Sequence, residues 1–351
     1  MAKGRPSIRD VARQSGVSLT TVSLVLNNND ARISEATRNR VLEAMKTLDY
    51  TPSRLARGLP NRRANTLAVL VPAIHHAFAD VYFGEIISGI YEAASERGYR
   101  MLLEVARREY VLRREYLTIL DDCSVDGILF IGATEEHNWL EDFHDTNRPL
   151  MVVNTRLERW NLHRVVCDYE AAGRLAADYL ADLGHRRIAH IAGPSGVVAT
   201  IRDLSESFLA RLEQRGIRMA GNMVVEGQLL VETGRFAAAE LLRRDPRLTA
   251  IFSANDKMAL GAYQAIREAG KVPGKDIAVI GCDDIPTAAL ADPPLTTVRM
   301  NYVDVGATAA RRLLEHIESN GSAEGLIFEK LPVALAARES CCPPPTSPAL
   351  V

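Results

Sequence analysis

A short stretch near the start of the chain carries hydroxyl and methyl groups where a helix would expose them. Residues 18–27 read SLTTVSLVLN, and Val22, Val25 and Leu26 recur at the spacing of one helical face. With those three side chains turned inward, the outward face presents Leu19, Thr20, Thr21, Ser23 and Leu24. Hydroxyls hydrogen-bond to base edges and phosphates, and methyl groups contact the thymine methyl. On one isolated helix, such a face is more often an ordinary solvated surface.

The neighbouring residues predict two short helices joined by a tight turn. Ser7 followed by Asp10 fits a capped helix start. The apolar residues behind it lie on one face, as Ile8, Val11 and Ala12. Gly16 would end this helix, and Ser18 would begin the second. Two short helices with a glycine-containing turn between them are typical of a helix-turn-helix.

A third helix is expected from about residue 34 to 48, with a buried face of Val41, Leu42, Met45 and Leu48. Charge sets this region apart, because residues 1–63 contain 12 Lys and Arg but only 5 Asp and Glu. The whole chain has a formal net charge of −2, so the remainder is acidic. A small basic module on a larger acidic body suits nucleic-acid binding, although a basic arm without a partner is also common.

A second group of polar residues follows the first apolar runs of the body. Asp80, Tyr82 and Phe83 come after the run at 67–72, and Asn154 ends the run LMVVN. Carboxylates and amides hydrogen-bond to sugar hydroxyls, and an aromatic ring covers an apolar sugar face. These residue types therefore favour a site for a small polar molecule.

Two later runs also end in polar residues. Asn255 and Asp256 end AIFSAN and open the next helical pattern, and Asp283 and Asp284 end IAVIGCDD. Asp and Asn at such positions commonly cap the following helix instead of binding a ligand. We expect capping to be the role of Asp256.

Apolar runs alternate with helical patterns from residue 65 onward. Short runs at 67–72, 127–132 and 277–284, among others, predict a parallel sheet covered by helices on both faces. Their number is too high for one compact sheet. Ligands of open α/β sheets bind at the carboxyl ends of the strands, where the polar residues above would gather.

Composition and motifs argue against several classes of protein. The chain of 351 residues is 47% hydrophobic and 25% charged, and no apolar run is long enough to span a membrane. The opening MAKGRPSIRD lacks the apolar segment of a secretory signal, so we expect a cytoplasmic protein. Five cysteines show neither metal-ligand spacing nor a disulfide framework, and we expect buried, reduced thiols, no metal and no cofactor.

No motif indicates an enzyme. The stretch GPSG lacks the G-x-G-x-x-G of a dinucleotide site, and no nucleophile motif stands out. An active site assembled from scattered residues is the weaker alternative.

The helical region resembles a known family. IRDVARQSGVSLTTVSLVLN followed by ISEATRNRVLEAMKTLDYTPSRLARGL is similar to the DNA-binding headpiece of the LacI/GalR family of bacterial transcription regulators. The similarity covers motif, order and spacing, and it continues to about residue 338. It implies that Leu19, Thr20, Thr21, Ser23 and Leu24 enter the major groove, with Asn27 and Thr37 near phosphates. Many members carry Arg where this chain has Leu24, so the resemblance also implies a different operator preference.

The stretch TPSRLARGLPNRRANT would link the headpiece to the body. By resemblance it is the hinge helix, which folds when two subunits meet over DNA. Leu59 would then be a wedge in the minor groove beside Ala56, while Arg54 and Arg57 reach phosphates. Pro60, directly after the wedge, departs from the family pattern.

For the body, the resemblance implies two Rossmann-like lobes of the periplasmic-binding-protein type I fold. The chain would cross between the lobes near residues 165, 298 and 326, and an effector would bind in the cleft. The family motif GxDD…PPLTTVR places Asp283 in the effector pocket, and Asn255 carries over likewise. The arginine of the family motif RxxGF is replaced by Leu204, and Arg202 would substitute for it.

We therefore expect an α/β protein with four parts: a headpiece at 1–50, a hinge and linker at 51–64, a two-lobed body at 65–338, and a disordered proline-rich tail at 339–351. The expected function is a homodimeric repressor that binds a pseudo-palindromic operator in double-stranded DNA. A small molecule, by resemblance a sugar or sugar derivative, would control it. A solute-binding protein of the same two-lobed fold is the alternative.

Overall fold

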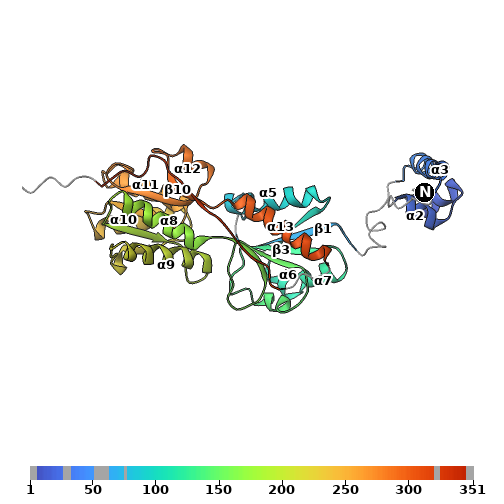
Figure 1. Cartoon of the computed structure of the whole chain (residues 1–351), viewed down its shortest axis with the longest axis horizontal. Coiled ribbons are helices and arrows are strands. Elements are labelled where there is room, and N and C mark those ends of the chain that lie inside the picture. The colour runs from blue at the N-terminus through green and yellow to red at the C-terminus, as the bar shows by residue number, and fades with distance from the viewer. Residues whose placement is uncertain (1–5, 27–32, 51–62, 75–76, 320–324, 345–351) are drawn as a thin grey trace, which may run out of the picture. The chain divides into compact units, whose positions relative to one another are not determined.

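The computed structural model describes residues 6–26, 33–50, 63–74, 77–319 and 325–344. Internal contacts divide the chain into two compact units. The first unit takes residues 1–66 with 117–126, and the second takes 67–116 with 127–351. Figure 1 shows the chain and labels several elements of each unit.

Three helices make up the described part of residues 6–50: α1 (Ile8–Ser15), α2 (Leu19–Leu26) and α3 (Glu35–Thr47). Four valines are buried between them, namely Val11, Val22, Val25 and Val41. The predicted buried face of α3 is wrong for Leu42, which is 46% exposed. Ala44 takes its place in the core, because Val41, Ala44, Met45 and Leu48 follow the helical period and Leu42 does not.

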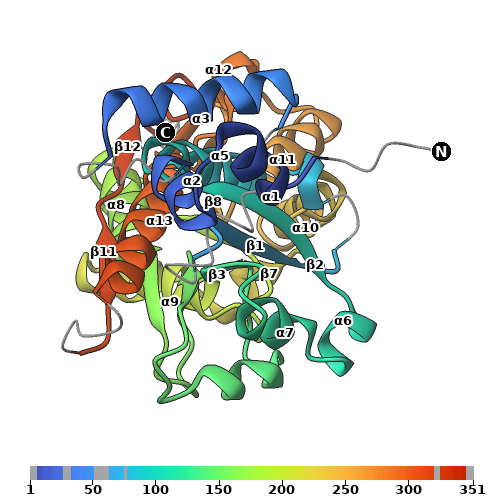
Figure 2. The same ribbon diagram turned by 90° about the vertical axis from the view of Figure 1, so that its right-hand side faces the viewer.

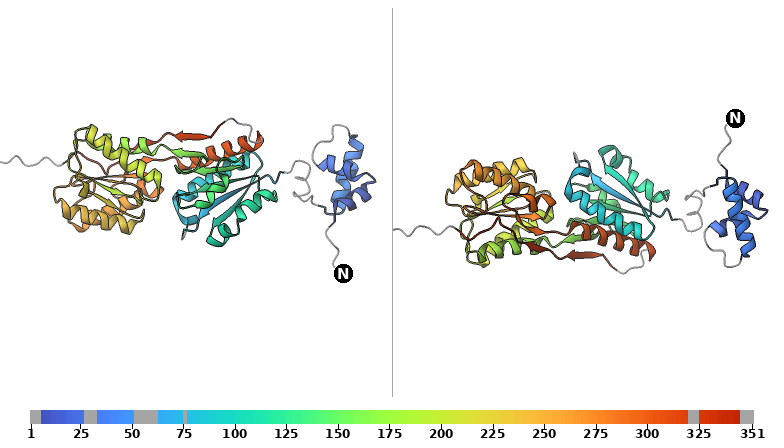
Figure 3. Two further views of the ribbon diagram at one scale, coloured as in Figure 1. Left: turned by 90° about the horizontal axis from the view of Figure 1, so that it is seen from below. Right: turned by 90° about the horizontal axis from the view of Figure 1, so that it is seen from above.

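The second unit contains two lobes, each built on a six-stranded sheet (Figure 3). Lobe 1 comprises the described residues of 67–116, 127–167 and 301–331, and lobe 2 comprises 168–300 and 333–342. In lobe 1 the strand order is β11-β5-β4-β3-β1-β2. The strands are β1 (Thr66–Pro72), β2 (Arg100–Ala106), β3 (Gly127–Ile131), β4 (Leu150–Val153), β5 (His163–Cys167) and β11 (Phe328–Leu331). All of them except β2 belong to parallel pairs of known register.

Helices cover the sheet of lobe 1. The long helices α5 (Val81–Glu96) and α13 (Tyr302–Glu318) pack against each other, and α13 also packs on β3, β4 and β5 (Figures 1 and 2). The shorter elements are η1 (Ala77–Ala79), α6 (Arg108–Leu112) and η2 (Asn138–Phe143). Helix α7 (Glu115–Asp121) spans the division between the two units.

Lobe 2 repeats this plan with the strand order β12-β10-β9-β8-β6-β7. The strands are β6 (Ile188–Ala192), β7 (Val224–Glu226), β8 (Ala250–Ser253), β9 (Ala278–Asp283), β10 (Thr296–Arg299) and β12 (Ala334–Ala336). Only β12 pairs in the antiparallel sense. The helices are α8 (Tyr169–Asp182), α9 (Ala199–Gln214), η3 (Gly221–Met223), α10 (Val231–Arg244), α11 (Asp256–Glu268) and α12 (Pro286–Leu290). A three-helix region and two α/β lobes agree with the expected fold class.

The chain passes between the lobes three times, after β5, after β10 and after β11. The first two crossings lie within a few residues of the predicted positions 165 and 298. The third comes later than residue 326, because β11 still pairs with β5 as far as Leu331.

The tail departs from its prediction of disorder at residues 339–344. Ser340 is fully buried, where its Oγ donates to the Val279 carbonyl at 2.5 Å and accepts the Thr296 N–H at 2.8 Å. His185 Nε2 lies 2.9 Å from the Cys342 carbonyl oxygen. These bonds fasten the segment to the sheet of lobe 2, while residues 345–351 lie outside the described part of the chain. All five cysteines are free, and the expectation of buried thiols is wrong for Cys123, which is exposed.

Candidate DNA-binding and effector sites

The hydroxyl face of α2 lies where the sequence places it. Leu19 is 45% exposed and Thr20 is exposed, while Thr21, Ser23 and Leu24 are partly exposed. Val22 and Val25 face the core on the opposite side of the helix. The hydroxyl of Thr21 lies 2.9 Å from Ser18 Oγ, which also accepts the Thr21 N–H at 3.1 Å. Thr21 therefore supports the helix start as well as lining the face.

The first helix is fixed at both ends. The Asp10 carboxylate accepts the N–H of Ser7 at 2.9 Å and its hydroxyl at 2.6 Å, as the capping pattern predicts. These two hydrogen bonds hold the pKa of Asp10 below its usual value. Gly16 ends the helix with φ +66°, a left-handed conformation that suits glycine. The tight turn between α1 and α2 follows from this geometry.

The start of α3 brings Ser34, Thr37 and Arg40 together. Ser34 Oγ accepts the Thr37 N–H at 3.3 Å and lies 3.0 Å from the Thr37 hydroxyl. Arg40 donates to that hydroxyl at 3.4 Å. A helix N-terminus with an arginine beside it attracts anions.

The other residues predicted to contact DNA lie outside the described part of the chain, so their contacts stay predictions. They are Asn27, Arg54, Ala56, Arg57 and Leu59.

In lobe 1, Asn154 makes several hydrogen bonds near the junction of the lobes. It follows β4 with φ +55° and is 2% exposed. Its Oδ1 accepts the Cys167 N–H at 3.0 Å, and its Nδ2 donates to the hydroxyls of Tyr169 at 3.0 Å and Tyr82 at 3.4 Å. The Tyr82 ring packs edge-on against Phe83, which is buried. The predicted residues Tyr82, Phe83 and Asn154 thus come together.

Asp80 joins the two lobes. Its Oδ1 accepts the Tyr82 N–H at 3.1 Å and so caps α5, while its Oδ2 accepts from Lys257 Nζ of α11 at 2.7 Å. Both side chains of this ion pair are about one-third exposed. The carboxylate predicted to bind an effector therefore already has two partners.

Asp283 lies at the carboxyl end of β9, at the junction of the lobes. Its Oδ1 accepts the hydroxyl of Tyr302, from α13 of lobe 1, at 2.6 Å. Burial raises the pKa of Asp283 to about 7, and the Tyr302 hydrogen bond and Lys257 offset only part of that rise. Near neutral pH this carboxyl can therefore either donate or accept a hydrogen bond.

At the start of α11, the residue that caps the helix is not the one expected. Asn255 caps the helix, because its Oδ1 accepts the Met258 N–H at 2.9 Å, and its Nδ2 donates to the Leu229 carbonyl at 3.2 Å. The prediction that Asp256 is the cap is wrong by one residue. Asp256 is fully buried and accepts the Thr297 hydroxyl at 2.6 Å and the Ile285 N–H at 2.9 Å. Effector binding by Asn255 stays a prediction.

Arg202 lies on α9 at another part of the lobe junction. It donates to Glu158 of lobe 1 at 3.3 Å. Beside it, Arg156 forms a two-pronged ion pair with Asp203, at 2.9 and 2.6 Å. Arg156, Asp203 and Lys257 were not identified from the sequence, because an ion pair between distant segments leaves no local pattern.

Two further findings concern the described residues. None of their helices is long and apolar enough to cross a membrane. Within the same part of the chain, no group of three His, Cys, Asp or Glu side chains could hold a metal ion.

An exposed helix-turn-helix followed by a two-lobed ligand-binding fold defines a class of transcription regulators. Residues 7–53 match the model of bacterial regulatory proteins of the lacI family, and residues 177–341 match that of the periplasmic-binding-protein-like domain. The repressor PurR of Vibrio atlanticus is 34% identical over 93% of this chain and 96% of its own length. The regulator DegA of Bacillus subtilis is 34% identical over 97% and 99%. The chain belongs to the LacI family and is a DNA-binding transcription regulator.

Solved structures of LacI-family regulators also resemble this chain over nearly its whole length. A complex of the regulator CelR with cellobiose has a TM-score of 0.72 and 31% identity, covering 96% of this chain and all of that one. The lac repressor dimer bound to operator and the anti-inducer ONPF has a TM-score of 0.83 and 27% identity over 97% of this chain and all of that one. The match of the headpiece supports the regulator over the solute-binding alternative, and the named relatives are regulators, not enzymes.

Proposed function

We propose that this chain is a repressor that works as a homodimer on a pseudo-palindromic operator and is controlled by a small molecule bound between its lobes. The observation that carries the proposal is the exposed hydroxyl face of α2 on a capped helix-turn-helix, in a chain whose two lobes meet through Asp80, Asp283 and Arg156. Action on operator DNA implies a cytoplasmic protein.

At the operator, Leu19, Thr20, Thr21, Ser23 and Leu24 enter the major groove, and Thr37 and Asn27 contact phosphates. The neutral face suits close approach to bases, while the basic residues of the headpiece supply attraction to the backbone. In the segment outside the described residues, Leu59 and Ala56 occupy the minor groove, with Arg54 and Arg57 on phosphates.

The effector is a sugar or sugar derivative. Supporting this class, the structural relatives include CelR with cellobiose and an Enterococcus faecium LacI-family regulator with bound ribose. The polar groups of the lobe junction, including Asn154, Tyr82 and Asp283, are of the kind that hydrogen-bond to hydroxyls. Arg202 and Asn255 are further proposed effector-binding residues.

Regulation follows from the ion pairs between the lobes. A ligand that binds the closed and open arrangements unequally shifts their populations, and DNA binding shifts them reciprocally. Asp80–Lys257 and Arg156–Asp203 are two contacts that any separation of the lobes must break. The lac repressor dimer on its operator is the model for the proposed assembly.

Two experiments test this function. Selection of duplexes from a random pool by the full chain is expected to enrich an inverted repeat, and enrichment of no sequence would contradict operator binding. A thermal-shift screen of sugars, polyols and uronates is expected to find a ligand that raises the melting temperature, because binding to the folded state alone stabilises it. That ligand must also change the affinity for the selected duplex; a ligand without this effect would contradict regulation.

A further inference from the structure

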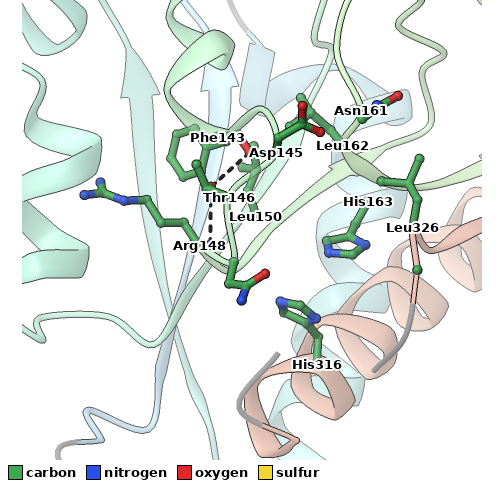
Figure 4. Close-up of a pocket in the computed structure, with 12 residues that line it drawn as sticks. Phe143, Asp145, Thr146, Arg148, Leu150, Asn161, Leu162, His163, His316 and Leu326 are labelled. Atoms are coloured by element: carbon green, nitrogen blue, oxygen red, sulfur yellow. Dashed lines mark hydrogen bonds between the residues drawn. The ribbon is translucent and has the colours of Figure 1, made fainter. Parts of the chain in front are cut away.

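A pocket in lobe 1 lies at the amino ends of β4, β5 and β11, at the opposite edge of the sheet from the effector candidates. Its volume is about 480 Å³, which is within the range of sites for small metabolites. The polar residues that line it include Asn147, Asn161, His163 and His316. Figure 4 shows the imidazoles of His163 and His316 next to each other. This pocket goes beyond the proposed function, which does not use it.

His316 gives the pocket an unsatisfied polar group. It lies in the last turn of α13 and is 4% exposed, and neither ring nitrogen has a hydrogen-bond partner among the described residues. An imidazole always carries at least one N–H donor, and an unpaired buried polar group is costly. Its ring centroid lies 4.6 Å from that of His163, which is half-buried in the pocket wall.

Neither ring nitrogen of His163 has a lone pair left to bind a metal ion. Its Nδ1 accepts the Ile327 N–H at 3.0 Å, so the proton of the neutral ring lies on Nε2. Burial and the neighbouring His316 lower the pKa of His163 and keep the ring neutral. His163 Nε2 is thus a hydrogen-bond donor, which calls for an acceptor in the pocket.

The remaining lining groups are also rich in donors. Asn147 and Asn161 carry amide N–H donors, whereas the guanidinium of Arg148 points away from the two imidazoles (Figure 4). Asp145, the acidic side chain among the described residues of the lining, is 69% exposed and lies 3.2 Å from His144 Nε2. We propose that this pocket binds a small metabolite through an oxyanion group, either a carboxylate or a phosphate, independently of the interlobe effector.

Histidine ring signals in nuclear magnetic resonance test this site directly. The full chain, labelled with ¹⁵N at its histidine rings, is titrated separately with inorganic phosphate and with succinate. We expect saturable shifts of the His163 and His316 signals with at least one anion, and which anion acts identifies the oxyanion. His190 is the internal control, because it is fully buried and both of its ring nitrogens have partners, Phe252 O and Ser205 Oγ.

Two variants check the location of binding. Asn161→Asp adds a negative charge at an exposed position of the lining and is expected to weaken anion binding about tenfold or more. His316→Phe is expected to abolish the shift of His163 while leaving the His190 signal in place. The absence of a saturable shift with both anions, or unchanged affinity in Asn161→Asp, would overturn the proposal. Neither result depends on DNA or on the interlobe effector, so failure here leaves the proposed function untouched.

Discussion

Asp283 makes the stability of the body depend on pH. Its pKa rises on folding from 3.8 to about 7, mainly because burial disfavours the charged form. Between these values the folded chain holds a proton that the unfolded chain has released. The contribution of this group to the free energy of unfolding is therefore greatest at low pH and is lost as the pH rises through about 7.

Replacing Asp283 by Asn should remove this loss, because the amide oxygen still accepts the Tyr302 hydroxyl but does not titrate. We expect the variant to gain at least ~1 kcal/mol of unfolding free energy relative to the parent between about pH 5 and about pH 8. Urea denaturation at the two pH values measures the difference. A constant difference between the proteins would show that this carboxyl is charged throughout.

Thr20 is the residue of α2 best suited to a test of base contact. Its hydroxyl is exposed, whereas the Thr21 hydroxyl is already hydrogen-bonded to Ser18. Thr20→Ala is expected to cost ~1–3 kcal/mol of affinity for the selected duplex, with no change in the salt dependence set by phosphate contacts. Thr47→Ala is the matched control, because the Thr47 hydroxyl donates to Glu43 O within α3 at 2.9 Å. Equal losses in both variants, measured by fluorescence anisotropy, would argue against base contact by α2.

At the scale of elements, glycines allow pairs of helices to pack closely. A Cβ at Gly89 of α5 would lie 1.9 Å from the Val303 carbonyl oxygen at the start of α13, whereas a Cβ at Gly84 of the same helix would meet nothing within 4 Å. Gly261 of α11 would clash in the same way with Val231 of α10. Close approach of these helix pairs requires a residue without a side chain.

Gly89→Ala is accordingly expected to lower the free energy of unfolding by ~1–3 kcal/mol through overpacking. Gly84→Ala is the control in the same helix, and it should be neutral or should raise the stability by up to ~1 kcal/mol, because alanine favours helix. Thermal unfolding of the two variants separates these effects. Similar behaviour of both would show that α5 and α13 move apart at little cost.

Local patterns predicted most of the elements, and long-range pairing accounts for the rest. The capping pair Ser7 and Asp10, the turn at Gly16 and the hydroxyl face of α2 depend on residues close in sequence, and all three agree with the structure. Strands β7 and β12 are only three residues long and form by pairing with neighbouring strands of the sheet. They contain no apolar run long enough to predict a strand from the sequence. The tail at Ser340 is ordered by bonds to Val279 and Thr296, which its proline-rich sequence does not reveal.

The residues of the candidate effector site could be predicted from local patterns, but their hydrogen-bond partners could not. Asp283 and Asn154 lie at the carboxyl ends of β9 and β4, because parallel strands present these ends together, and Tyr82 reaches the same junction from α5. The partners of these residues came from other segments, namely Tyr302 and Tyr169. Which polar atoms are already bonded depends on the tertiary fold, so the sequence could not separate the cap Asn255 from the buried Asp256.

At the scale of the whole body, the ion pair between Asp80 and Lys257 links α5 of lobe 1 to α11 of lobe 2. Lys257→Met is expected to raise amide hydrogen exchange in the first turns of both helices about tenfold, because lobe separation becomes easier. Lys271→Met is the control, since Lys271 donates to Pro246 O within lobe 2 at 3.0 Å. Unchanged exchange in Lys257→Met would show that this pair does not hold the lobes together.

The central claim is that two copies of the helix-turn-helix read an operator by symmetry. The most direct measurement is the affinity of the full chain for a selected inverted-repeat duplex and for the same duplex with one half-site scrambled. We expect two chains per duplex and much tighter binding to the intact repeat. Equal affinity for the two duplexes, or binding of one chain per duplex, would contradict it.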